Sequence, residues 1–113
     1  MMMLLTKQNK NDLPAMYSQD GKGDNAKAVV KFFAPDSSWT WYAVEGYPVL
    51  DDTGREVDYE FFGLVDGFDA ELGYFRLSEL KKARGQLGLP VERDRYFRPI
   101  TLGEVRAKYV AAR

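Results

Sequence analysis

Three carboxylates lie close together in the segment LVDGFDAELGYF, residues 64–75. Asp66, Asp69 and Glu71 could form a pair of catalytic acids, or they could bind Mg²⁺ or Ca²⁺ through oxygen. The EF-hand spacing, with a glutamate at position 12 of the loop, is absent. Asp66 and Gly67 also form a dipeptide typical of turns between antiparallel strands. The segment therefore predicts a structural strand connection, with a metal site or a carboxylate enzyme as the alternatives.

Two tryptophans form a second candidate site. Trp39 and Trp41 alternate on one face of a predicted strand, and Tyr42 lies on the other face. Large aromatic side chains usually fill the core of a small protein. Without a covering helix they would form a platform on which bases or a partner's side chains can stack. Glu45 is expected on the same face, at the edge of that platform.

Three arginines form the third candidate site. Arg93, Arg95 and Arg98 are interleaved with Tyr96 and Phe97, so they could grip phosphates beside aromatic rings. Glu92 precedes this run and Asp94 interrupts it, and the net charge of the whole chain is −1. Nucleic-acid binders usually carry a dense basic patch. The sequence therefore supports a single-strand nucleic-acid binder only as an alternative.

The composition excludes several kinds of chemistry. The 113 residues include no cysteine and no histidine. Thiolate and iron–sulfur chemistry, histidine general bases and the usual zinc ligands are therefore excluded within this chain. No complete phosphate loop is present, and no cofactor is expected. A non-catalytic role fits these absences best.

The start of the chain, MMMLLTKQNK, bears on localisation. A secretory signal needs an apolar run of about 7–15 residues and a membrane span needs about 20. This segment has neither, so we expect a cytoplasmic protein without a membrane anchor.

Charge is unevenly distributed along the chain. Residues 45–71 carry nine acids and one base. Residues 76–113 carry ten bases and four acids. Solvated loops and helix faces would account for this charge distribution. The alternative is a two-faced molecule whose basic side meets nucleic acid or an acidic protein.

Hydrophobic patterns and capping signals predict one α+β domain, residues 1–113, with a mostly antiparallel sheet of four or five strands. Two or three short helices are expected to pack on one side of it. The capping box of Thr101 and Glu104 should start the last helix at Leu102, with Val105, Tyr109 and Ala112 also facing inward. The expected strands are residues 26–35, 39–47, 58–66 and 73–77, and residues 91–97 are expected to form an edge strand or an extended arm. The other expected helices are residues 4–13, capped by Thr6, and residues 78–87, capped by Ser78.

Five segments carry a family resemblance through their order in the chain: LLT, VVKFFAPDSSWTWY, FFGLVDG, ELGYFRLSEL and LGLPVERDRYFRP. In this order they resemble a bacterial family, domain of unknown function 2958 (DUF2958). The resemblance covers almost the whole chain and implies a small cytosolic bacterial protein, often encoded on plasmids and other mobile elements. It supplies no activity, cofactor or catalytic residue. Members are expected to differ near residues 51–58.

These observations favour a non-catalytic protein-binding or accessory module linked to mobile elements. The first alternative is a single-strand nucleic-acid binder, and the second is a carboxylate or metal-assisted enzyme. The candidate binding surface comprises Trp39, Trp41, Glu45, Glu71, Arg93, Arg95 and Arg98, and the weak metal candidates are Asp66, Asp69 and Glu71.

Overall fold

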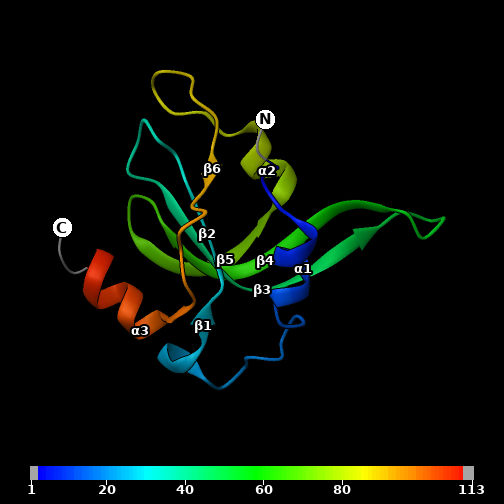
Figure 1. Ribbon diagram of the computed structural model, residues 1–113, viewed down its shortest axis with the longest axis horizontal. Helices are drawn as coiled ribbons and strands as arrows, with labels where there is room; N and C mark the ends of the chain where they lie inside the picture. Colours follow the sequence, from blue (N-terminus) through cyan, green and yellow to red (C-terminus); the bar gives the residue numbers. More distant parts are fainter. Residues whose placement is uncertain (1–2, 111–113) are drawn as a thin grey trace.

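The computed structural model describes residues 3–110 and has an α+β architecture, which confirms the predicted fold class (Figure 1). Five antiparallel strands form the main sheet in the order β5-β4-β3-β2-β6. A second, two-stranded sheet pairs β1 with β7. The strands are β1 (Lys27–Ala28), β2 (Val30–Phe33), β3 (Thr40–Leu50), β4 (Glu56–Asp66), β5 (Ala70–Arg76), β6 (Glu92–Arg93) and β7 (Ile100–Thr101).

The hairpin of β3 and β4 is the longest element of the sheet. Each strand has 11 residues, and their pairing runs from Thr40 opposite Asp66 to Leu50 opposite Glu56. The neighbouring strands β2 and β5 cover only the inner part of this hairpin. Its outer part therefore projects beyond the rest of the sheet, as the green strands in Figure 1 show.

Both faces of the sheet are covered by helices. We call face A the one that carries Phe32 and Phe61, and face B the one that carries Tyr42 and Leu64. The helix α1 (Lys7–Asp12) is flanked by buried leucines of the core on face A, and α2 (Leu77–Lys82) contributes Leu80 to that core.

The helix α3 (Leu102–Val105) packs on face B instead, and a π-helical turn, η2 (Arg106–Val110), continues it. The prediction placed all helices on one side of the sheet. The middle of β4 reads FFGL, and it is buried or half-buried on both of its faces. An apolar strand of this kind needs cover on both sides, which explains the division of the helices.

The second helix differs from its prediction at both ends. Ser78 does not cap it, because its hydroxyl donates a hydrogen bond to Asp58 of β4 at 2.6 Å. The position before the helix is occupied by Arg76, whose backbone N–H donates to the Glu79 carboxylate. After Lys82 the chain becomes extended and folds back, so the predicted last turn to residue 87 is a loop.

The capping box at the start of α3 is confirmed. The Glu104 N–H donates to the Thr101 hydroxyl, and the Thr101 N–H donates to the Glu104 carboxylate, both at 3.1 Å. Leu102 and Val105 are buried, as predicted. Tyr109 is half-exposed, and its ring lies 6.1 Å from that of Tyr42. Ala112, the remaining residue of the predicted inner stripe, lies outside the described residues.

Removing the cap should destabilise the protein. We expect Thr101→Ala to lower the free energy of unfolding by about 1 kcal/mol, because the Glu104 N–H loses its acceptor. Urea denaturation followed by tryptophan fluorescence would measure the change. Thr101→Ser keeps the hydroxyl and is the matched control. Equal stability of the alanine variant and the wild type would contradict the role of the cap.

Candidate functional site

Three aromatic side chains meet at one end of face A. The ring centroids of Trp39 and Trp41 are 5.9 Å apart, and both rings pack partly against the core. Phe68, in the turn between β4 and β5, meets Trp39 edge-on with centroids 5.5 Å apart. A Cβ at Gly67 would lie 2.5 Å from the Trp39 ring, so only glycine lets this ring rest directly on the turn. Phe68 itself is 92% exposed.

These rings line a cleft of about 790 Å³, which we call the aromatic cleft. Trp39, Trp41 and Phe68 form its aromatic wall, and the segments 36–38 and 83–86 form the rest. The Asp36 carboxylate fixes the far wall, because it accepts hydrogen bonds from the backbone N–H groups of the loop that follows α2. The donors are Leu87, at 2.7 Å, and Leu89, at 3.3 Å.

The same loop approaches Asp36 closely at a second point. A Cβ at Gly85 would lie only 1.7 Å from Asp36 Oδ1, so a larger residue would push the loop away. The turn between β2 and β3 and the loop after α2 are thus locked together by Asp36. Two walls of the cleft are therefore connected by hydrogen bonds to one carboxylate.

A smaller hollow of about 240 Å³ lies on the other side of Trp39 and Phe68. Asp69 and Glu71 line it, and both residues are exposed. Within residues 3–110, neither carboxylate makes a hydrogen bond or an ion pair through its side chain. Glu71 lies opposite Val65, which lies opposite Trp41, so the three share face A. Negative charge therefore sits beside the aromatic cleft.

The three weak metal candidates do not converge. Asp66 lies opposite Ala70, on face B, and is only 4% exposed, whereas Glu71 lies on face A. In the described part of the chain, no three acidic side chains are placed to hold a metal ion. The segment between β4 and β5 is a strand connection, as the sequence predicted.

The prediction for Glu45 is wrong. The pairing of β3 with β4 shifts between Ala43 and Glu45, which is a β-bulge at Val44. One extra residue in the strand moves every later side chain to the other face. Glu45 therefore lies opposite Phe62, on face B, away from Trp41. It is 2% exposed and accepts hydrogen bonds from two backbone N–H groups of the segment before η1 (Gly23–Asn25).

Arg93 lies in line with Trp41 across the sheet, because Phe32 of β2 is opposite both residues. Arg93 is on the edge strand β6, and its guanidinium donates hydrogen bonds to the backbone carbonyls of Met3 and Leu4. Burial lowers the pKa of Arg93, as does the charge of Arg95. Arg95 and Arg98 are exposed, but no arginine of this set lines the aromatic cleft. The predicted nucleic-acid surface is thus only partly assembled, since Arg93 is near Trp41 but its guanidinium is turned to the N-terminal segment.

Comparison with known proteins adds one finding. A family model described as "Protein of unknown function (DUF2958)" matches residues 4–109, almost the whole chain. The chain belongs to this family. Neither a curated protein nor a solved structure matches it significantly. The resemblance to DUF2958 in the sequence is therefore confirmed.

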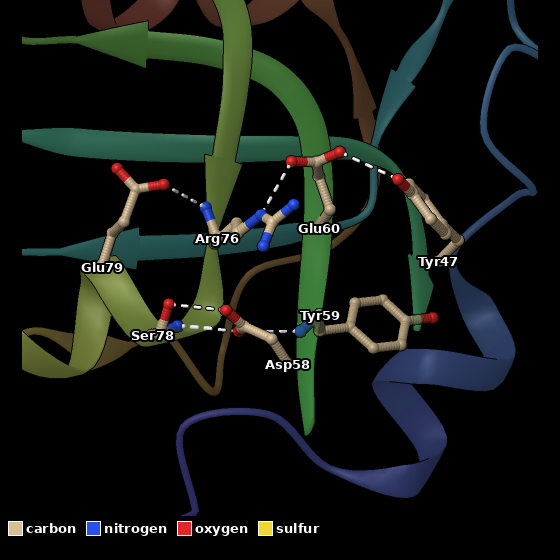
Figure 2. A network of polar contacts seen from close by, with 7 residues as sticks. All are labelled: Tyr47, Asp58, Tyr59, Glu60, Arg76, Ser78 and Glu79. Atoms are coloured by element: carbon tan, nitrogen blue, oxygen red, sulfur yellow. Dashed lines mark hydrogen bonds and ion pairs between the residues drawn. The ribbon is translucent and has the colours of Figure 1, made fainter. Parts of the chain in front are cut away.

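Elsewhere in this DUF2958 chain, a polar network joins β3, β4, β5 and α2 (Figure 2). Glu60 accepts hydrogen bonds from the Tyr47 hydroxyl at 3.0 Å and from Arg76 Nε at 3.1 Å. Asp58 accepts from the Tyr59 N–H and from both the N–H and the hydroxyl of Ser78. The network connects elements of the fold, because Glu60 bonds to β3 and β5 and Asp58 bonds to α2.

Two tyrosines on face B, Tyr47 and Tyr74, have raised pKa values. The hydrogen bond to Glu60 raises the pKa of Tyr47, and its negative charge adds to the effect. A hydrogen bond with Tyr17 raises the pKa of Tyr74. Catalytic nucleophiles usually need a lowered pKa or an adjacent base. Neither of these two DUF2958 tyrosines has a lowered pKa, and the acceptor beside the Tyr47 hydroxyl is the Glu60 carboxylate.

Asp58 should make stability depend on pH. Burial acts to raise its pKa, but hydrogen bonds from Ser78 and Tyr59 and the charge of Arg76 outweigh burial and lower it. A carboxyl with a lowered folded pKa stabilises the protein above its unfolded pKa, about 3.9, and this stabilisation is lost as pH falls through the folded pKa.

We therefore expect the free energy of unfolding to decline as the pH falls below about 4. Asp58→Asn should be less stable near neutrality and should lose less stability on acidification. Urea denaturation across this pH range would measure both, with the exposed Asp52→Asn as control. An acid decline of the same size in Asp58→Asn and wild type would contradict this role of Asp58.

The sequence interpretation missed two residues of this DUF2958 site. The sequence did indicate that Phe68 would be exposed, since a phenylalanine inside the turn DGFD has no strand neighbours to cover it. No local pattern indicated the role of Asp36, because its partners in the loop after α2 are about 50 positions away in the chain.

No helix within residues 3–110 combines the length and the apolar character that a membrane span requires.

Proposed function

We propose that this DUF2958 protein is a non-catalytic module that binds a segment of another protein in the aromatic cleft. The observation that carries the proposal is Phe68, which is 92% exposed yet packs edge-on against Trp39. Exposed aromatic side chains beside a preformed hollow are typical of interaction sites. Tryptophan is also enriched among the residues that dominate binding energy in protein interfaces.

The carboxylates beside the cleft indicate which residue types the bound segment carries. Asp69 and Glu71 line the hollow beside Trp39 and Phe68, and neither is neutralised within the described residues. A lysine or arginine of the partner could pair with these carboxylates and lie against an aromatic ring. The expected ligand is therefore a segment with an apolar or aromatic anchor for the cleft and a basic residue next to it.

The same charges argue against the first alternative. Nucleic-acid phosphates would meet Asp69 and Glu71 at the edge of the aromatic surface, and like charges repel. Arg93 is engaged with the N-terminal segment instead of being free to meet phosphates. Both observations favour a protein ligand over a single strand.

We further propose that this binding takes place in the cytoplasm of a bacterium, as an accessory function of a mobile genetic element. The support is the setting in which DUF2958 proteins are expected to occur. A module of this size, without an activated catalytic group among those described above, could serve transfer, maintenance or evasion of host defence by holding another protein.

Selection from a displayed peptide library would test the proposal. The wild-type protein is the bait, and selected peptides should share an apolar anchor within a few positions of lysine or arginine. We expect Phe68→Ala to weaken the binding of a selected peptide about tenfold or more, because it removes a ring of the cleft. Asp69→Asn and Glu71→Gln should weaken it less, and more so at low salt.

A matched control distinguishes binding in the cleft from nonspecific binding through exposed aromatic side chains. Tyr96 is 86% exposed and does not line the aromatic cleft, so Tyr96→Ala should leave the affinity unchanged. Peptides that bind the wild type and Phe68→Ala equally well would overturn the proposal. So would salt-sensitive retention on single-stranded DNA that depends on Trp41, because counterion release would then mark phosphate contacts.

A further inference from the structure

The strand β5 forms an open edge of the main sheet. It is the last strand in the order β5-β4-β3-β2-β6, and its seven residues pair with β4 alone. Natural proteins usually protect an edge with a short strand, lysine, proline or a bulge. The opposite edge is protected in this way, because β6 has only two residues. β5 contains neither lysine nor proline, and its pairing has no bulge. Its charged side chains are Glu71 and Arg76, and Arg76 is paired with Glu60 of β4.

The same strand leaves apolar side chains uncovered on face B. Leu72 is 48% exposed and Tyr74 is 54% exposed. Tyr74 lies opposite Phe62 of β4, with ring centroids 5.1 Å apart. An open row of backbone groups and an uncovered apolar stripe therefore coincide on one strand. A partner that adds a strand to β5 would satisfy both.

We propose that this partner is a second copy of the chain, whose β5 pairs antiparallel with the first around a two-fold axis at Gly73. In this register Leu72 lies opposite Tyr74 of the second copy, and the two-fold axis repeats the contact. Leucine beside an aromatic ring is a favourable cross-strand pair. A two-fold axis also closes the assembly at two copies.

The remaining positions fit the same register. Glu71 lies opposite Phe75 of the second copy, and Arg76 lies opposite Ala70, so no like charges face each other. A Cβ built at Gly73 would meet no atom within 4 Å, so the centre of the interface is unobstructed. A foreign strand would need its own matching pattern, whereas β5 already complements itself.

Cysteine cross-linking tests this geometry directly, because the chain has no cysteine of its own. Opposite Cα atoms of an antiparallel pair are about 4.5–5.5 Å apart, within the range that a disulfide spans. We expect Gly73→Cys to form a disulfide-linked dimer under mild oxidation. Tyr96→Cys is the matched control, since its side chain is exposed and lies away from β5, and it should stay monomeric under the same conditions.

Sedimentation of the cysteine-free protein gives an independent measurement. The wild type should show a monomer–dimer equilibrium that shifts with concentration, and Leu72→Lys should shift it strongly toward monomer. Leu50→Lys, at an exposed position of the outer hairpin, should leave it unchanged. Thermal melts would establish that both variants are folded.

Three outcomes would overturn the proposal: a wild type that stays monomeric over a wide concentration range, a dimer insensitive to Leu72→Lys, or equal cross-linking of Gly73→Cys and Tyr96→Cys. If β5 pairs with a strand from a different protein instead, the purified wild type stays monomeric, which is the first of these outcomes.

Discussion

Gly63→Ala should destabilise the protein by more than about 3 kcal/mol. A Cβ at this position would lie 1.8 Å from the backbone oxygen of Tyr42 and 3.0 Å from the Cα of Ala43. Both atoms belong to the backbone of β3, which faces Gly63 directly in the sheet. They can move only if β3 and β4 separate at the centre of the sheet, so the clash cannot be relieved by a side-chain rotation.

Gly73 provides the control for this substitution. It lies directly opposite Gly63 in the pairing of β4 with β5, yet a Cβ there would meet nothing within 4 Å. Gly73→Ala should therefore change the free energy of unfolding by no more than about 0.5 kcal/mol. Urea denaturation of both variants measures the contrast. Similar stabilities of the two alanine variants would show that β3 and β4 are not packed this closely.

The second large effect is expected at Glu45. We expect Glu45→Ala to lower the free energy of unfolding by about 2–4 kcal/mol, since hydrogen bonds to a charged acceptor contribute about 1.5–3 kcal/mol each. Its buried carboxylate accepts from the Tyr17 N–H at 3.0 Å and from the Gln19 N–H at 2.6 Å. Tyr17 has a positive φ of 69°, a conformation that non-glycine residues seldom adopt without support.

The loop held by Glu45 offers a local readout besides stability. Lys22 lies in the same segment, so trypsin should cleave after it faster in Glu45→Ala than in wild type. Glu45→Gln keeps one acceptor oxygen and should fall between the two. Substitution of the exposed Asp52 is the control for loss of one negative charge. Unchanged stability together with an unchanged rate of cleavage after Lys22 would refute the anchoring role.

The sequence predicted those elements whose signals are local. The capping box of Thr101 and Glu104 lies within four residues, and it starts α3 as expected. The alternation of Trp39 and Trp41 also placed both rings correctly on one face. In contrast, the bulge at Val44 leaves no mark in the alternation, because the residues around it are all buried. The sequence therefore predicted the wrong face of the sheet for Glu45.

The candidate site was only partly predictable for a related reason. The aromatic cleft is closed by segments that are distant in sequence, since Asp36 and Phe68 belong to different turns and Arg84 follows α2. Ser78 was assigned as a helix cap because its partner on β4 is 20 positions away. Local patterns carry no information about such contacts, so the residue types suggested binding while the shape of the site came only from the fold.

The outer part of the β3–β4 hairpin has a consequence for how this chain can evolve. Beyond the segments that pair with β2 and β5, the two strands pair only with each other in the main sheet, and Leu50 and Val57 are exposed. Lengthening such a hairpin adds matched residue pairs without disturbing the core, and the entropy of closing a loop rises only slowly with its length. Insertions and deletions should therefore accumulate around residues 51–55, while the length of the chain near the bulge and the aromatic cleft stays fixed.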